Sequence, residues 1–169
     1  KEVIIHMPMQ SSLGAKGEDD YKLKVGMTSD EIEWRLNEAL KEIPEAIGIN
    51  NHQGSKATTD GKVMGVVASV LKQKNKIFLD SRTSSKTVGE KTMRTYGVPT
   101  ARRHVFLDND LDIDKISQQL EKLVKVSKKN GIAIGIGHVK PNTLKVLKEE
   151  IPKLSDKGYE FKFLSQVVN

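Results

Sequence analysis

Cysteine is absent from the 169-residue sequence, and aromatic residues make up only 5% of it. Without cysteine the chain has no disulfides and no thiolate ligands, so a bound metal must be held by His, Asp, Glu or water. So few aromatic residues argue against the base-stacking surfaces of single-stranded nucleic-acid binders. We therefore expect no nucleic-acid partner, and we interpret the net charge of +6 as solvated helix surface that also suits an anionic matrix such as a cell wall.

Long apolar runs are also lacking. No stretch of 18 apolar residues occurs, so we predict no transmembrane segment. No signal peptide is visible, and the sequence begins with Lys1 rather than Met, inside an apolar run, so we expect residues upstream of Lys1. A glycine-rich phosphate loop and the nucleophile elbow of serine hydrolases are missing as well.

The sequence does contain a regular alternation of apolar runs and helical patterns. Strands are predicted at 3–5, 46–49, 76–79, 102–108, 132–138 and 159–164. Helices are predicted between them, the first opened by a capping box at Thr28 and Glu31. Apolar rather than alternating strands indicate a parallel α/β sheet covered by helices. The order fits an open doubly wound sheet or part of a (β/α) barrel, as a single domain over residues 1–169.

Polar side chains follow four of these strands. His6, His52 and His138 each come after an apolar run, and Asp80 and Arg82 follow another. In a parallel sheet these positions meet at one edge, the carboxyl ends of the strands, where α/β active sites usually lie. We therefore expect one functional site there.

The residue types indicate the chemistry. Neutral imidazoles with a carboxylate bind Zn²⁺ or similar divalent ions, a separate Asp can deprotonate water, and a separate His can protonate a leaving group. Arg82 can keep Asp80 charged or bind a substrate oxygen. The stretch 48–55 adds amides and a Gly-Ser turn at a strand tip, so we assign substrate binding to Asn50, Asn51 and Ser55. The fourth histidine, His104, precedes its apolar run, and we expect a structural role for it.

Five motifs, in order along the chain, resemble those of the divergent polysaccharide deacetylase family. They are Ile4-Ile5-His6-Met7-Pro8-Met9, Gly48-Ile49-Asn50-Asn51-His52-Gln53-Gly54-Ser55, Phe78-Leu79-Asp80-Ser81-Arg82-Thr83, Val105-Phe106-Leu107-Asp108 and Ile134-Gly135-Ile136-Gly137-His138. The resemblance implies a distorted (β/α) barrel of the polysaccharide deacetylase type, with its first strand or strands missing from this sequence. It also implies metal-dependent removal of acetyl groups from an N-acetylated glycan, in a secreted, periplasmic or cell-envelope protein.

By position in these motifs, His6 and His52 would be ligands of one divalent ion, most often Zn²⁺. His138 would match the late catalytic histidine, and Asp80 and Arg82 would line the site as catalytic residues. In the family the carboxylate ligand comes from an aspartate pair upstream of these motifs, so we expect it before Lys1. The alternative is a glycan-binding or regulatory module on the same scaffold, without turnover.

Overall fold

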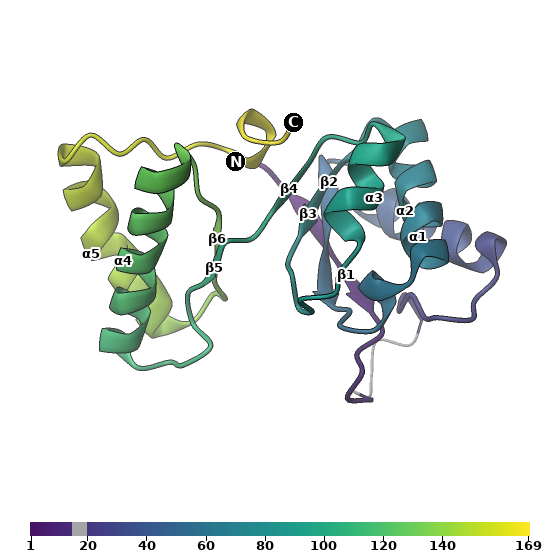
Figure 1. The fold of residues 1–169 in the computed structure, drawn as a ribbon, viewed down its shortest axis with the longest axis horizontal. Coiled ribbons are helices and arrows are strands. Elements are labelled where there is room, and N and C mark those ends of the chain that lie inside the picture. Colours follow the sequence, from purple (N-terminus) through teal and green to yellow (C-terminus); the bar gives the residue numbers. More distant parts are fainter. Residues whose placement is uncertain (15–19) are drawn as a thin grey trace. The chain divides into compact units, whose positions relative to one another are not determined.

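The computed structural model describes residues 1–14 and 20–169, which form a mixed α/β fold with parallel sheets and five α-helices (Figure 1). These residues divide into two compact units. The first comprises residues 1–102 with 164–169, and the second comprises residues 103–163. The α/β class predicted from the sequence is confirmed, whereas closure of a barrel and a single domain over residues 1–169 stay predictions.

The first unit contains a four-stranded parallel sheet in the order β1-β2-β3-β4. Its strands are β1 (Ile4–Met9), β2 (Gly48–Gln53), β3 (Ile77–Asp80) and β4 (Thr100–Arg102). The helices between them are α1 (Ser29–Glu42), α2 (Gly61–Gln73) and α3 (Gly89–Tyr96), with a 3₁₀ turn η1 (Ala57–Thr59). Each helix links two neighbouring parallel strands, as in repeated β-α-β units.

Local sequence sets the ends of these helices. The predicted capping box is present, because the Thr28 hydroxyl accepts from the Glu31 N–H and the Glu31 carboxylate accepts from the Thr28 N–H. Asp60 caps α2 through the Val63 N–H, and Gly97 ends α3 in the left-handed conformation at φ +67°.

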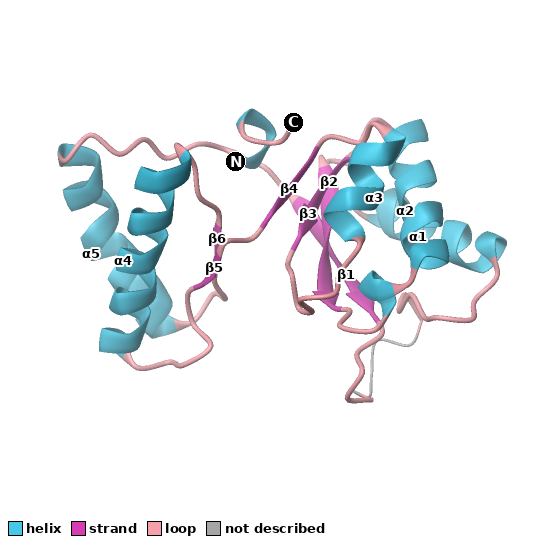
Figure 2. Ribbon diagram, in the orientation of Figure 1, coloured by secondary structure: helices cyan, strands magenta, loops and turns pink. Residues whose placement is uncertain are grey.

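The helices of the first unit pack on one face of its sheet (Figure 2). Strand residues Ile5, Ile49 and Phe78 lie in one row of the sheet, and they share one core cluster with the apolar sides of α1, α2 and α3. The neighbouring row, with His6 and Asn50, belongs to the opposite face. Helices on one face are typical of a barrel wall, whereas a doubly wound sheet carries them on both.

The second unit is smaller. It contains a two-stranded parallel sheet of β5 (Val105–Phe106) and β6 (Gly135–Ile136), with helices α4 (Ile113–Asn130) and α5 (Pro141–Asp156). The helices pack through a cluster that includes Ile116, Leu120 and Val146. Across residues 1–14 and 20–169, no helix has both the length and the apolar character that a membrane crossing requires.

The structure corrects several of the strand predictions. β1 and β2 run past the apolar residues, so His6 and His52 lie within strands rather than after them. Pro8 lies within β1, because β1 is the first strand in the sheet order and such a strand tolerates a missing N–H donor. The run 102–108 is divided between β4 and β5. Residues 159–164 form no strand, since alternation alone is insufficient without a hydrogen-bonding neighbour, and the chain enters a 3₁₀ turn η2 (Leu164–Gln166) instead.

Candidate functional site

His6 and His52 meet on the sheet face opposite the helices. Pro8 pairs with His52 and His6 pairs with Asn50, so both histidines project from the same face of neighbouring strands. The distance from His52 Nδ1 to His6 Nε2 is 2.9 Å, and the two rings are arranged edge to face with centroids 4.7 Å apart. The sheet register thus brings together the two residues predicted as metal ligands.

The facing nitrogens suit a metal ion in part. With Zn–N bonds of 2.0–2.1 Å and tetrahedral angles, two imidazole nitrogens on one zinc ion lie about 3.3 Å apart, so the observed pair needs only a small separation to admit the ion. In the described part of the chain, no group of three or more His, Cys, Asp or Glu side chains is placed to hold a metal. These residues therefore fit two of the three protein ligands that a catalytic zinc usually has.

Two buried asparagines support the histidine pair. Asn50 Oδ1 lies 2.9 Å from His6 Nδ1, and Asn50 Nδ2 donates to the Ser81 hydroxyl at 3.1 Å. Asn51 Oδ1 accepts from the Ser81 N–H at 2.8 Å. Both amides are buried and form hydrogen bonds to other residues of the protein, which is a structural role. Substrate binding by Asn50 and Asn51 stays a prediction.

A constrained turn follows β2. Gln53 and Gly54 have φ angles of +53° and +84°, a conformation that costs a non-glycine residue energy and is often found near functional sites. The Asn51 side-chain amide and the Thr83 hydroxyl both donate to the Gln53 carbonyl oxygen, at 2.8 and 2.6 Å, and hold the turn. The hydroxyl of Ser55 accepts from the Ser12 N–H at 2.9 Å, so the described contact of Ser55 is with the loop after β1. Its assignment to substrate binding stays a prediction.

Asp80 is fully buried at the end of β3. One carboxylate oxygen accepts from the Arg82 N–H at 2.8 Å, and the other accepts from the Thr87 hydroxyl at 2.9 Å and the Glu90 N–H in the first turn of α3 at 3.2 Å. These bonds anchor the loop between β3 and α3, in which Arg82 adopts a φ of +49°. The catalytic assignments of Asp80 and Arg82 stay predictions beside this structural role.

A second polar cluster lies in the second unit, after β5 and β6. Asp108 Oδ1 lies 3.1 Å from His138 Nδ1, while Asp108 Oδ2 accepts from the His138 N–H at 2.6 Å and the Thr143 hydroxyl at 2.9 Å. The Asp108 side chain is fully buried, whereas that of His138 is 54% exposed. A carboxylate at Nδ1 favours the tautomer with the proton on that nitrogen, which leaves Nε2 to exchange protons with another molecule.

The hydrogen bonds to Asp108 control its ionisation. Burial by itself would raise the pKa of the carboxyl group, but the bonds from the His138 N–H, the Thr143 hydroxyl and the His138 ring outweigh burial and lower the pKa below its ordinary value. Asp108 is therefore charged near neutral pH.

Sequence reasoning named His138 but not its partners Asp108 and Thr143. A signal for Asp108 was present, because it follows an apolar strand as Asp80 does. The structural role expected for His104 is confirmed, since its Nδ1 accepts from the Ile134 N–H at 3.0 Å.

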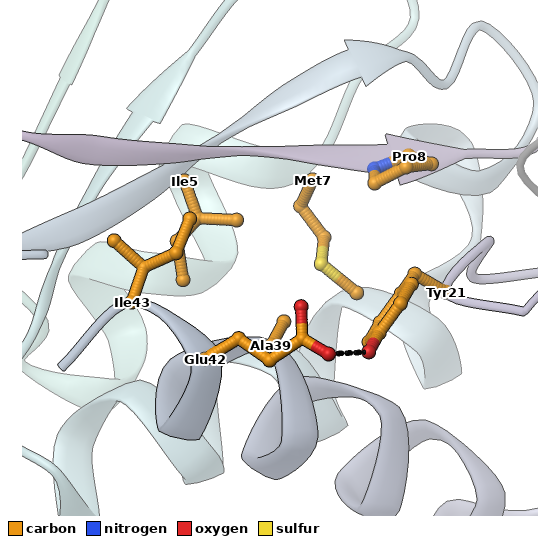
Figure 3. Close-up of a pocket in the computed structure, with 7 residues that line it drawn as sticks. All are labelled: Ile5, Met7, Pro8, Tyr21, Ala39, Glu42 and Ile43. Atoms are coloured by element: carbon orange, nitrogen blue, oxygen red, sulfur yellow. Dashed lines mark hydrogen bonds between the residues drawn. The ribbon is translucent and has the colours of Figure 1, made fainter.

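A small apolar pocket of about 150 Å³ lies beside β1 and α1 (Figure 3). Tyr21, one of the residues that line the pocket, donates a hydrogen bond to Glu42. The lining residues are Ile5, Met7, Pro8, Tyr21, Ala39, Glu42 and Ile43. None of them is a predicted ligand or catalytic residue.

The sequence matches the family model described as divergent polysaccharide deacetylase over residues 1–168. The chain belongs to this family. It is 38% identical over 156 residues to an uncharacterized protein of Haemophilus influenzae, covering 92% of this chain and 55% of that protein. It is 37% identical over 153 residues to the uncharacterized protein YibQ of Escherichia coli K12, covering 90% of this chain and 48% of that protein. The chain thus spans about half the length of these curated relatives.

A solved structure supports the fold of this family member. The crystal structure of the uncharacterized protein ATU2773 from Agrobacterium tumefaciens C58 is similar with a TM-score of 0.93 and 19% sequence identity, over 99% of this chain and 68% of that chain. At that identity the likeness concerns the fold alone.

Proposed function

We propose that the protein is a metal-dependent hydrolase that removes acetyl groups from an N-acetylated glycan. The observation that carries the proposal is the pair of imidazole nitrogens of His6 and His52, facing each other at 2.9 Å in a member of this family. Imidazole nitrogens are common ligands of Zn²⁺. The family supports the choice of substrate, and it also supports a secreted or cell-envelope location, which cell fractionation tests.

The reaction that we propose is amide hydrolysis. The water oxygen loses a proton to a base and forms a bond to the acetyl carbon. The carbon–nitrogen bond breaks with its electron pair remaining on nitrogen, and a proton is delivered to that nitrogen, so that acetate and a free amine are released. A divalent ion held by His6 and His52, with a further ligand, would supply Lewis-acid activation of water at neutral pH. In the second unit, His138 with Asp108 at its Nδ1 is a group of the type that donates such a proton, and we assign it the role of general acid as part of this proposal.

A second candidate is a glycan-binding module without turnover. The observation that favours it is that the described residues contain no group of three metal-ligating side chains of His, Cys, Asp or Glu type. A carboxylate ligand elsewhere in the full-length protein would favour the enzyme, because two imidazoles alone bind zinc weakly.

The deciding experiment measures acetate release by the full-length protein. The substrates are N-acetylated oligosaccharides, offered with Zn²⁺, Co²⁺ or Mn²⁺ and after treatment with a chelator. The enzyme proposal expects metal-dependent acetate release that is lost in His6→Ala and His52→Ala. Binding of the same oligosaccharides by calorimetry, with no acetate released under any metal, would instead establish the binding module.

A further inference from the structure

Asn50 occupies a position between a predicted metal ligand and the neighbouring strand. Its Oδ1 atom lies 2.9 Å from His6 Nδ1, and its Nδ2 atom donates to the Ser81 hydroxyl. The asparagine is 6% exposed, and Ser81 is 3% exposed. In the structure the carbonyl oxygen of Asn50 faces His6 and its NH₂ group faces Ser81. Because a neutral imidazole can donate or accept, this orientation of the amide and the tautomer of His6 are linked.

The orientation of this amide has a consequence for His6. A carbonyl oxygen at Nδ1 selects the tautomer that carries its proton on Nδ1, so the lone pair of neutral His6 is on Nε2. Nε2 is the atom that faces His52 Nδ1. The opposite tautomer would place a proton on Nε2 and remove one of the two nitrogens that can bind an ion.

We propose that Asn50 is a positioning residue of the metal site, which fixes the tautomer and ring orientation of His6 through its carbonyl oxygen. The inference rests on the metal-dependent function proposed above and assigns Asn50 to ligand support rather than to substrate. Hydrogen-bond partners behind metal-ligating histidines typically contribute about 10–100-fold to metal affinity.

Asn51 serves as the matched control. It is also a buried asparagine of β2 that bonds to Ser81, but its bonds go to the Ser81 N–H, the Gln53 carbonyl and the Thr83 hydroxyl rather than to a histidine. Loss of the Asn51 amide removes hydrogen bonds to the loops after β2 and β3 but none to His6. Comparison of the two variants therefore separates support of the ligand His6 from general support of these loops.

The first measurement uses the full-length protein without metal. Side-chain ¹⁵N NMR at about pH 8, where an ordinary imidazole is neutral, reports which nitrogen of His6 carries the proton. We expect the Nδ1–H tautomer in the wild type and in Asn50→Asp, whose carboxylate is also an acceptor, and its loss in the similarly sized Asn50→Leu. An Nε2–H tautomer in the wild type would overturn the inference without the need for any variant.

The second measurement is titration with Zn²⁺ alone, by calorimetry, with thermal unfolding as the check on folding. Asn50→Leu should lower Zn²⁺ affinity about 10–100-fold, Asn50→Asp should restore it, and Asn51→Ala should leave it within a few-fold of wild type. Equal affinities for Asn50→Leu and wild type, or an equal loss in Asn51→Ala, would refute the positioning role. A wild-type protein that binds no Zn²⁺ would refute the metal function itself, while the metal-free tautomer measurement would still decide whether Asn50 orients His6.

Discussion

Replacement of Asp108 by alanine should destabilise the protein substantially. The change removes the acceptor of three hydrogen bonds, from the His138 N–H, the Thr143 hydroxyl and the His138 ring. Loss of the bond from Thr143 should lower the unfolding free energy most, because Thr143 is 1% exposed and its hydroxyl would be left buried without this partner.

The magnitude follows from the burial of each donor. A hydrogen bond to a charged group contributes about 1.5–3 kcal/mol, and the buried Thr143 hydroxyl should lose close to that amount. The two contacts from His138 are only partly buried, so water can accept hydrogen bonds from these donors when the carboxylate is removed. Removal of a buried carboxylate also recovers part of the free energy that its desolvation costs. The net loss should be about 2–4 kcal/mol of unfolding free energy.

Urea denaturation followed by far-UV circular dichroism measures this loss. Asp114→Ala is the matched control, since Asp114 is an exposed aspartate in the first turn of α4 and its removal should cost no more than about 1 kcal/mol. If Asp108→Ala were no more destabilising than Asp114→Ala, the carboxylate would not hold this cluster together and our interpretation would be wrong.

The same carboxylate predicts a dependence on pH. Its pKa in the folded protein lies below the ordinary value of 3.8, so its stabilising contribution is complete above that value and is lost as the pH falls through the folded pKa. The stability difference between wild type and Asp108→Ala should therefore shrink as the pH falls below about 4. A difference that grows as the pH falls through this acidic range would contradict the hydrogen-bonded, ionised carboxylate.

Four further predictions concern the site and the fold. In the full-length protein, His6→Ala or His52→Ala should abolish most metal affinity in calorimetric titration, and retention of wild-type affinity would exclude these residues as ligands. His138→Ala should keep the metal but slow acetate release by about 10²–10⁴-fold, as is typical for loss of a general acid, and loss of the metal in this variant would require the two roles to be exchanged. Gly48→Ala should prevent stable folding or lower the melting temperature strongly, because a Cβ atom there would lie 2.2 Å from the Ile77 carbonyl oxygen of β3. A melting temperature equal to that of the wild type would show that β2 and β3 can move apart to admit the methyl group. Thr28→Ala should cost about 1 kcal/mol through loss of the α1 cap, measured by urea denaturation, and a change below 0.3 kcal/mol would mean that solvent replaces the cap.

The sequence by itself was sufficient for features that depend on neighbours along the chain. The capping box at Thr28, the left-handed glycines after α3 and α4, and the parallel α/β class follow from local chemistry and apolar periodicity. The choice of His6 and His52 as partners also came from the sequence, because both follow apolar runs of predicted parallel strands and both stand in the motifs that resemble the family.

Only the tertiary structure decided which polar residues support others. The partners in each case are far apart along the chain: 46 residues for His6 and His52, 31 for Asn50 and Ser81, and 30 for Asp108 and His138. Burial decided the rest, since a buried carboxylate such as Asp80 must use its oxygens within the protein, whereas the half-exposed ring of His138 keeps one nitrogen for another molecule. Sequence spacing carries no record of burial, and so polar residues near the ends of two strands give a buried anchor in one case and a half-exposed ring in the other.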